Sequence, residues 1–185
     1  MAIITIKLRT GHRLLIGLLF AGTVLAQTVG EYQVKAAFLY NFAKFAEWPE
    51  QTFKTDRDPM RICVLGENPF GSALAEAVSG KTVLGRAFVV ADISDARQTG
   101  DCQIVFISSS ERKRLRSILQ EMRPTGILTV SEMEGFAAKG GMVNFKLDDG
   151  RVRLEINVEA AGQAQIHISS KVLSLAQIVK CGARQ

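Results

Sequence analysis

Histidine is scarce in this sequence, and the motifs of several enzyme classes are missing. Only two histidines occur, and one lies in an N-terminal segment with the features of a removable leader, which leaves His167. Neither a GxSxG nucleophile elbow nor an HExxH zinc motif is present, which argues against a His-based triad and a multi-histidine metal centre. We therefore expect a protein that is not an enzyme and needs no cofactor.

Long apolar runs are missing after residue 26. Residues 1–26 combine three basic residues with a short apolar run and with Val24 and Ala26 at the −3 and −1 positions of a small-residue cleavage site. This is the pattern of a secretory signal peptide, cleaved near Ala26 and Gln27. Because residue 27 is not cysteine and no later segment approaches roughly 18 uninterrupted apolar residues, we expect an exported protein that is neither lipid-anchored nor inserted in a membrane.

A strong charge excess is also missing once the leader is set aside. The leader holds three of the 23 Lys and Arg residues and none of the 18 acidic ones, so the full-length charge of +5 falls to +2. This balance gives no reason to expect nucleic-acid binding, which normally needs a clustered basic face. No linker, repeat or low-complexity tract divides residues 27–185, so we expect a single domain there.

The three cysteines do not form a CxxC motif, so a thioredoxin-type redox role lacks support. In an oxidising compartment two of them are expected to pair. Cys63 and Cys102 lie in or beside strand-like runs, whereas Cys181 is close to the C-terminus, so Cys63 with Cys102 is the favoured pair.

The segment from Gly140 to Asn157 predicts a β-hairpin. Asp149 and Gly150 suit the two central positions of a type I′ turn. This turn places apolar residues opposite apolar ones, and a slip by one residue would scramble that arrangement. The predicted pairs are Leu147 with Val152, Phe145 with Leu154, Val143 with Ile156, Lys146 with Arg153, Asn144 with Glu155, and Met142 with Asn157. Lys146, Arg151 and Arg153 form a basic cluster near the turn, and a solvated face is its simplest interpretation.

The rest of the chain alternates helix-like and strand-like segments, which predicts an α/β sandwich with a mainly parallel sheet, an antiparallel hairpin and flanking helices. The aromatic residues of the first helix are expected to form a core-facing stripe rather than a ligand-stacking surface. Strands are expected at 61–65, 86–93, 103–108 and 127–130, and helices at 31–48, 72–78, 110–122, 132–139 and 159–165, with a closing helix carrying Ile168, Val172, Leu175 and Val179.

Five segments together resemble the YfiR/HmsC family of small periplasmic proteins. They are EYQVKAAFLYNFAKFAEWP, ICVLGENPFG, GILTVSEMEGFAAKGGMVNF, RVRLEIN and ISSKVLSLAQIV. The resemblance implies a non-enzymatic homodimer that binds the periplasmic sensor domain of an inner-membrane diguanylate cyclase and represses it. Cyclic di-GMP and biofilm formation would thereby be controlled, and an OmpA-like outer-membrane lipoprotein could sequester the repressor.

The resemblance also points to individual residues. Cys63 and Cys102 match the family's disulfide pair, and Glu155 matches an acidic position in a surface thought to be inhibitory. Lys146 and Arg153 are further candidates for partner binding, although they could instead pair with Glu155 and make it structural. A periplasmic small-molecule sensor, with a pocket at the aromatic helix and the mouth of the sheet, is the alternative function.

Overall fold

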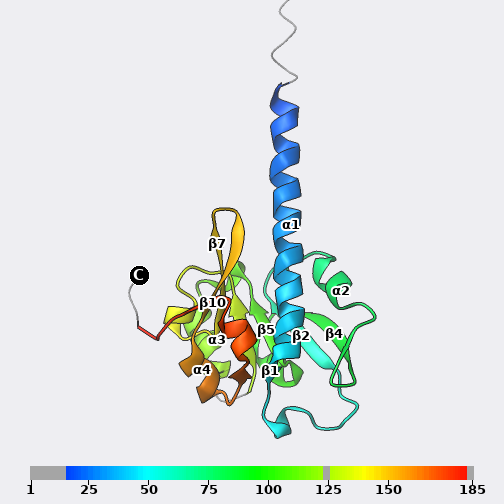
Figure 1. Ribbon diagram of the computed structural model, residues 1–185, viewed down its shortest axis with the longest axis vertical. Helices are drawn as coiled ribbons and strands as arrows, with labels where there is room; N and C mark the ends of the chain where they lie inside the picture. The colour runs from blue at the N-terminus through cyan, green and yellow to red at the C-terminus, as the bar shows by residue number, and fades with distance from the viewer. Residues whose placement is uncertain (1–15, 123–125, 183–185) are drawn as a thin grey trace, which may run out of the picture.

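The protein has three layers, with a central sheet between two groups of helices (Figure 1). The computed structural model describes residues 16–122 and 126–182, with side chains from residue 30 onward. One face of the sheet is covered by α1 (Ile16–Phe45), α2 (Ala73–Val78), α4 (Val158–Gln163) and α5 (Ser170–Leu173). The other face is covered by α3 (Leu115–Met122) and the 3₁₀ turn η2 (Ala96–Asp101). The predicted α/β sandwich is confirmed.

The main sheet has the strand order β10-β8-β7-β6-β5-β2-β4-β3. All neighbours from β4 to β7 pair in parallel, β8 pairs antiparallel with β7, and β10 pairs in parallel with β8. The strands are β2 (Met60–Leu65), β3 (Thr82–Val83), β4 (Arg86–Ile93), β5 (Ile104–Ile107), β6 (Leu128–Ser131), β7 (Val143–Asp148), β8 (Arg151–Ile156) and β10 (Ala176–Ile178). Strand β10 therefore forms one edge.

The long helix α1 packs its aromatic residues into the core, as the spacing predicted. Phe42 is buried, and its ring lies 6.1 Å from that of Phe145 and 6.2 Å from that of Phe38. The helix ends at Phe45 rather than Trp48, because Ala46–Glu47 form β1 and pair with β9 (His167–Ile168). Among the described residues, no helix is both long and apolar enough for a membrane crossing.

The hairpin of β7 and β8 has the predicted turn and register. Asp149 and Gly150 have φ values of 47° and 71°, as a type I′ turn requires. Every predicted pair from Val143 with Ile156 to Leu147 with Val152 is observed, and the Asn157 amide donates to the Met142 carbonyl. The basic cluster of Lys146, Arg151 and Arg153 is exposed, as a solvated face requires, whereas Asn144 and Glu155 at the base of the same polar side are buried.

The predicted closing helix is wrong. A single helical turn, α5, is followed by an extended β10, and only Val172 and Val179 of the later apolar positions are buried, whereas Leu175 is 68% exposed. Strand β8 would otherwise have an unpaired edge, and β10 satisfies its backbone groups. Apolar spacing alone cannot separate a short helix from a turn followed by a strand.

Two other local predictions need correction. The predicted helix 132–139 contains only the 3₁₀ turn η4 (Ala137–Lys139), since Gly135 has a positive φ that interrupts a helix. The predicted helix 110–122 begins only at Leu115, and Ser110 lies ahead of it in a 3₁₀ turn, where its hydroxyl accepts a hydrogen bond from the Glu67 amide. Ser108 is the capping residue, and it caps the 3₁₀ turn η3 (Ser109–Glu111) ahead of the helix.

Candidate functional site

Two of the three predicted contact residues are exposed on the polar face of the hairpin. Lys146 and Arg153 face each other across the β7–β8 ladder. Acidic side chains compensate for this like-charge pair, since Lys146 lies 3.6 Å from Glu155 and Arg153 lies 4.0 Å from Asp148. The Arg153–Asp148 pair is exposed and adds little stability, so Arg153 is able to meet a partner. Lys146 is half exposed, but its ammonium lies beside a buried carboxylate.

Glu155, the third predicted contact residue, is buried. The residue is 2% exposed, and its carboxylate accepts a 3.0 Å hydrogen bond from the Asn144 side-chain amide in addition to its contact with Lys146. A carboxylate in such a place must be held by partners inside the fold, because an unpaired buried charge is costly. These contacts are the ones that a structural role for Glu155 requires, and its role in partner binding stays a prediction.

The polar face of the hairpin and the edge strand β10 together enclose a groove of about 400 Å³. Lys146, Arg153 and Glu155 all line it, and the segment from Ser174 to Gln177 forms the opposite wall. Two large apolar side chains near this edge, Leu175 and Ile178, are 68% and 52% exposed. This wall was not predicted from the sequence, because the apolar spacing of the segment indicates a helix.

The other face of the hairpin tip borders α1. A second groove of about 400 Å³ lies between them, with Val34 and Leu147, which are 46% and 52% exposed, among its lining residues. Figure 1 shows the hairpin and α1 projecting from the body in the same direction. We call the exposed hairpin residues Lys146–Arg153 together with Leu175–Ile178 the hairpin face.

A buried ionic cluster fixes the position of α1 beside the end of β6. Lys35 is 3% exposed and forms ion pairs with Glu31 and Glu132, and the Tyr32 hydroxyl donates a 3.0 Å hydrogen bond to Glu132. Burial raises the pKa of Tyr32 above its usual value, and the negative charge of Glu132 raises that pKa further. The sequence signal was weak, because one member lies far from the others along the chain.

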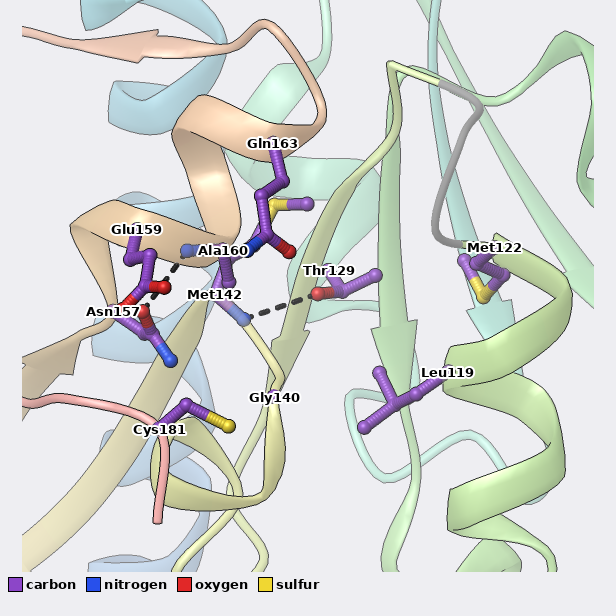
Figure 2. A pocket seen from close by; sticks show the side chains of 10 residues that line it. All are labelled: Leu119, Met122, Thr129, Gly140, Met142, Asn157, Glu159, Ala160, Gln163 and Cys181. Atoms are coloured by element: carbon purple, nitrogen blue, oxygen red, sulfur yellow. Dashed lines mark hydrogen bonds between the residues drawn. The ribbon is translucent and has the colours of Figure 1, made fainter. Parts of the chain in front are cut away.

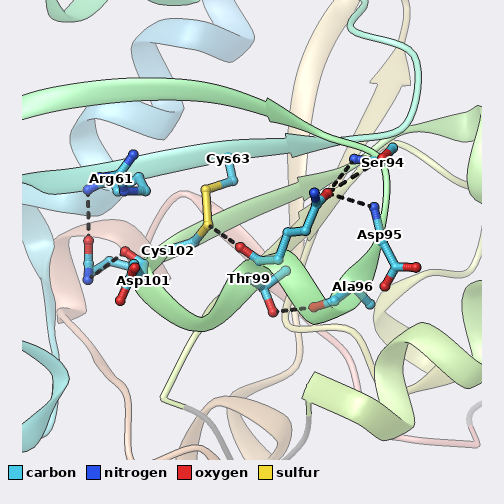
Figure 3. Close-up of a disulfide and its surroundings, with 10 residues drawn as sticks. Arg61, Cys63, Ser94, Asp95, Ala96, Thr99, Asp101 and Cys102 are labelled. Atoms are coloured by element: carbon cyan, nitrogen blue, oxygen red, sulfur yellow. Dashed lines mark hydrogen bonds between the residues drawn. A yellow bond between two sulfur atoms is a disulfide. The ribbon is translucent and has the colours of Figure 1, made fainter.

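The disulfide joins Cys63 in β2 to Cys102 at the end of η2, as predicted (Figure 3). Both half-cystines are buried in the core between the sheet and α3. The turn that presents Cys102 begins with a capping box, in which Asp95 accepts from the Arg97 amide and the Gln98 side chain accepts from the Asp95 amide. Cys181 remains an exposed free thiol.

A small cavity of about 130 Å³ lies between α3 and α4, with Cys181 at its mouth (Figure 2). Its polar walls serve the fold, since Thr129 accepts from the Met142 amide and Asn157 accepts from the Ala160 amide. His167 is exposed on β9 and is not among these lining residues. Among the described residues no group of three or more His, Cys, Asp or Glu could hold a metal ion.

Comparisons with known proteins identify a family for this chain. The family model described as YfiR/HmsC-like matches residues 32–177. No curated protein matches the chain.

Three solved structures are similar at low identity. An ABC domain from Streptococcus pneumonia in complex with L-Trp has a TM-score of 0.49 and 11% identity, over 65% of this chain and 55% of its own. A conserved domain protein from Vibrio cholerae has a TM-score of 0.49 and 13% identity, over 65% of this chain and 54% of its own. A substrate-binding protein with adhesive properties from Clostridium difficile has a TM-score of 0.48 and 11% identity, over 66% of this chain and 55% of its own. The chain thus spans just over half the length of these proteins.

Proposed function

Since the chain belongs to the YfiR/HmsC-like family of periplasmic regulators in cyclic di-GMP signalling, we propose that it binds the periplasmic sensor domain of an inner-membrane diguanylate cyclase and represses the enzyme. The observation that carries this proposal is the hairpin face, which combines exposed basic and apolar side chains around an edge strand. Exposed apolar residues beside charged ones are typical of interaction surfaces.

Repression requires only differential binding. If the repressor has a higher affinity for the inactive arrangement of the sensor domains than for the active one, it shifts the population by that difference in free energy. The hairpin face supplies two independent means of recognition. The free edge of β10 can pair with an added strand, and Lys146 and Arg153 can select an acidic surface.

Two further expectations belong to the same proposal. Residues 1–26 act as a signal peptide removed near Ala26 and Gln27, which N-terminal sequencing of the exported protein would test. The repressor is a homodimer that an OmpA-like outer-membrane lipoprotein sequesters, which light scattering and co-purification from envelope extracts would test. Proteins retaining residues 1–26, or a monomer that still represses, would contradict these expectations.

The direct test reverses the charge of the hairpin face. In cells lacking the gene, the double variant Arg151→Glu/Arg153→Glu, at two exposed positions of the hairpin face, should fail to lower cyclic di-GMP and should not capture a cyclase, whereas the wild-type protein does both. Lys44→Glu/Arg57→Glu changes the same number of charges at exposed positions away from the hairpin and should behave as wild type. If the two double variants are equally active, or gene deletion leaves cyclic di-GMP unchanged, the proposal is wrong.

A further inference from the structure

A groove of about 510 Å³ lies on the opposite side of the sheet from α1, between α3 and the loop that follows β6. Its apolar lining consists of Leu115, Leu119 and Met133, and its basic lining consists of Arg112, Lys113, Arg116 and Lys139. The basic residues come from both walls, because Lys139 lies in η4 and the other three lie in or just before α3.

Nearby carboxylates do not neutralise these four charges. Among the described residues, none of the four forms an ion pair. Several acids near these residues along the chain interact elsewhere, since Glu111 pairs with Arg114, Glu132 pairs with Lys35 and the exposed Glu121 lies near Arg97. Glu134 is exposed, and Lys139 donates to its backbone carbonyl oxygen. Gathering four like charges costs free energy through mutual repulsion, and a bound anion relieves that cost.

The shape and lining select the kind of anion. The volume lies within the range of small-molecule sites, which are apolar cavities with a few convergent polar groups. Leu115, Leu119 and Met133 are each at most 7% exposed, so they cannot insert into a bilayer as the residues of a membrane-docking surface do. They can instead contact the apolar body of a ligand whose charged group meets the basic rim.

We propose that this groove binds a small amphiphilic organic anion, with an apolar ring or short chain on the buried leucines and methionine and a carboxylate, sulfonate or phosphate on the basic residues. The site is separate from the hairpin face. This ligand site does not depend on whether the partner is a cyclase, so the ligand site and the proposed repression can each be disproved without the other. It also places a ligand site away from the aromatic helix, where Phe42 packs into the core.

A pair of fluorescent probes tests the proposal on the oxidised protein. Anilinonaphthalene sulfonate carries a negative charge, and N-phenylnaphthylamine has the same ring system without it. We expect the sulfonate to bind saturably. The affinity for the neutral probe should be lower by a factor of at least about five. Raising the salt concentration from about 0.05 M to about 0.5 M should weaken the binding of the sulfonate but not that of the neutral probe, because salt screens exposed charges.

Variants on both walls locate the site. Lys113→Gln/Arg116→Gln and, separately, Lys139→Gln should each raise the Kd for the sulfonate about five- to tenfold and leave the neutral probe unchanged. The control Lys44→Gln/Arg57→Gln removes two exposed charges elsewhere and should bind as wild type. Equal Kd values in all variants, or no saturable binding, would overturn the proposal. Sedimentation with phosphatidylglycerol vesicles but no saturable probe binding would overturn it in favour of a membrane surface.

Discussion

Asn144 and Glu155 lie opposite each other in the β7–β8 ladder, and the Asn144 side-chain amide donates a 3.0 Å hydrogen bond to the Glu155 carboxylate. Both residues are 2% exposed. The exposed Lys146 ammonium, 3.6 Å from the same carboxylate, extends this arrangement to the surface. The base of the hairpin is therefore a buried polar contact, and its tip carries the exposed charges.

This arrangement predicts that Glu155→Ala destabilises the fold. Removing the carboxylate leaves the buried Asn144 amide without its acceptor, which should lower the free energy of unfolding by about 1–3 kcal/mol. Urea denaturation of the oxidised protein measures the change. Glu134→Ala removes an exposed carboxylate and should change the value by less than about 0.5 kcal/mol. Unchanged stability with lost partner binding would instead make Glu155 a direct contact.

The hairpin shows what the sequence could predict. Turn residues and strand alternation act between neighbours along the chain, so Asp149, Gly150 and the apolar pairs specified both turn and register. The buried stripes of α1 and α3 were predictable for the same reason, because helical periodicity is local. The disulfide also followed from the strand context of its cysteines.

The rest depends on contacts between distant segments. Strand order, the pairing of β10 with β8 and the burial of Lys35 against Glu132 are decided by which elements meet in three dimensions. Leu175 illustrates the limit of prediction from local spacing. Its spacing suits a helix, but the residues that follow it form β10 and pair with the edge of β8. The candidate surface was therefore only half predicted, with the hairpin identified and its β10 wall missed.

The disulfide should be a major contribution to stability. Cys63 and Cys102 are 39 residues apart, and closing a loop of this length stabilises by about 4 kcal/mol in the chain-entropy model. The double variant Cys63→Ser/Cys102→Ser should lose stability of that order in urea denaturation. Cys181→Ser, at an exposed free thiol, should match the wild type. A small loss in the double variant would show that the sheet restrains these segments without the bond.

Gly141 should tolerate no side chain. A Cβ at this position would lie 2.1 Å from the Phe136 ring, which is fully buried and cannot move aside easily. Gly141→Ala is therefore expected to cost about 1–3 kcal/mol by overpacking. Gly162 in α4 is the matched control, since a Cβ there meets nothing within 4 Å and alanine should stabilise the helix by about 0.5–1 kcal/mol. Changes of opposite sign in the free energy of unfolding, measured by urea denaturation, would confirm the prediction. An unchanged free energy of unfolding in Gly141→Ala would contradict it.

Asp95 should make stability depend on acid pH. Hydrogen bonds from the Arg97 side chain and backbone amide hold the pKa of Asp95 well below its usual value. A carboxyl group with a lowered pKa in the folded state contributes stability above its unfolded pKa of about 3.9, and this contribution is lost as the pH falls toward the folded pKa. Asp95→Asn keeps a capping oxygen but removes the charge.

Measured by urea denaturation from neutral pH down to about pH 3, Asp95→Asn should therefore show a shallower loss of stability than the wild type below about pH 5. Arg97→Gln should show a smaller change in the same direction, because it removes the guanidinium that lowers the pKa of Asp95 but keeps the backbone amide that also lowers it. Part of the slope should survive in both variants, since hydrogen bonds from Thr55 lower the pKa of Asp58 and a hydrogen bond from Lys54 lowers that of Asp101. If either variant keeps the full wild-type slope, the capping pair does not contribute to acid sensitivity.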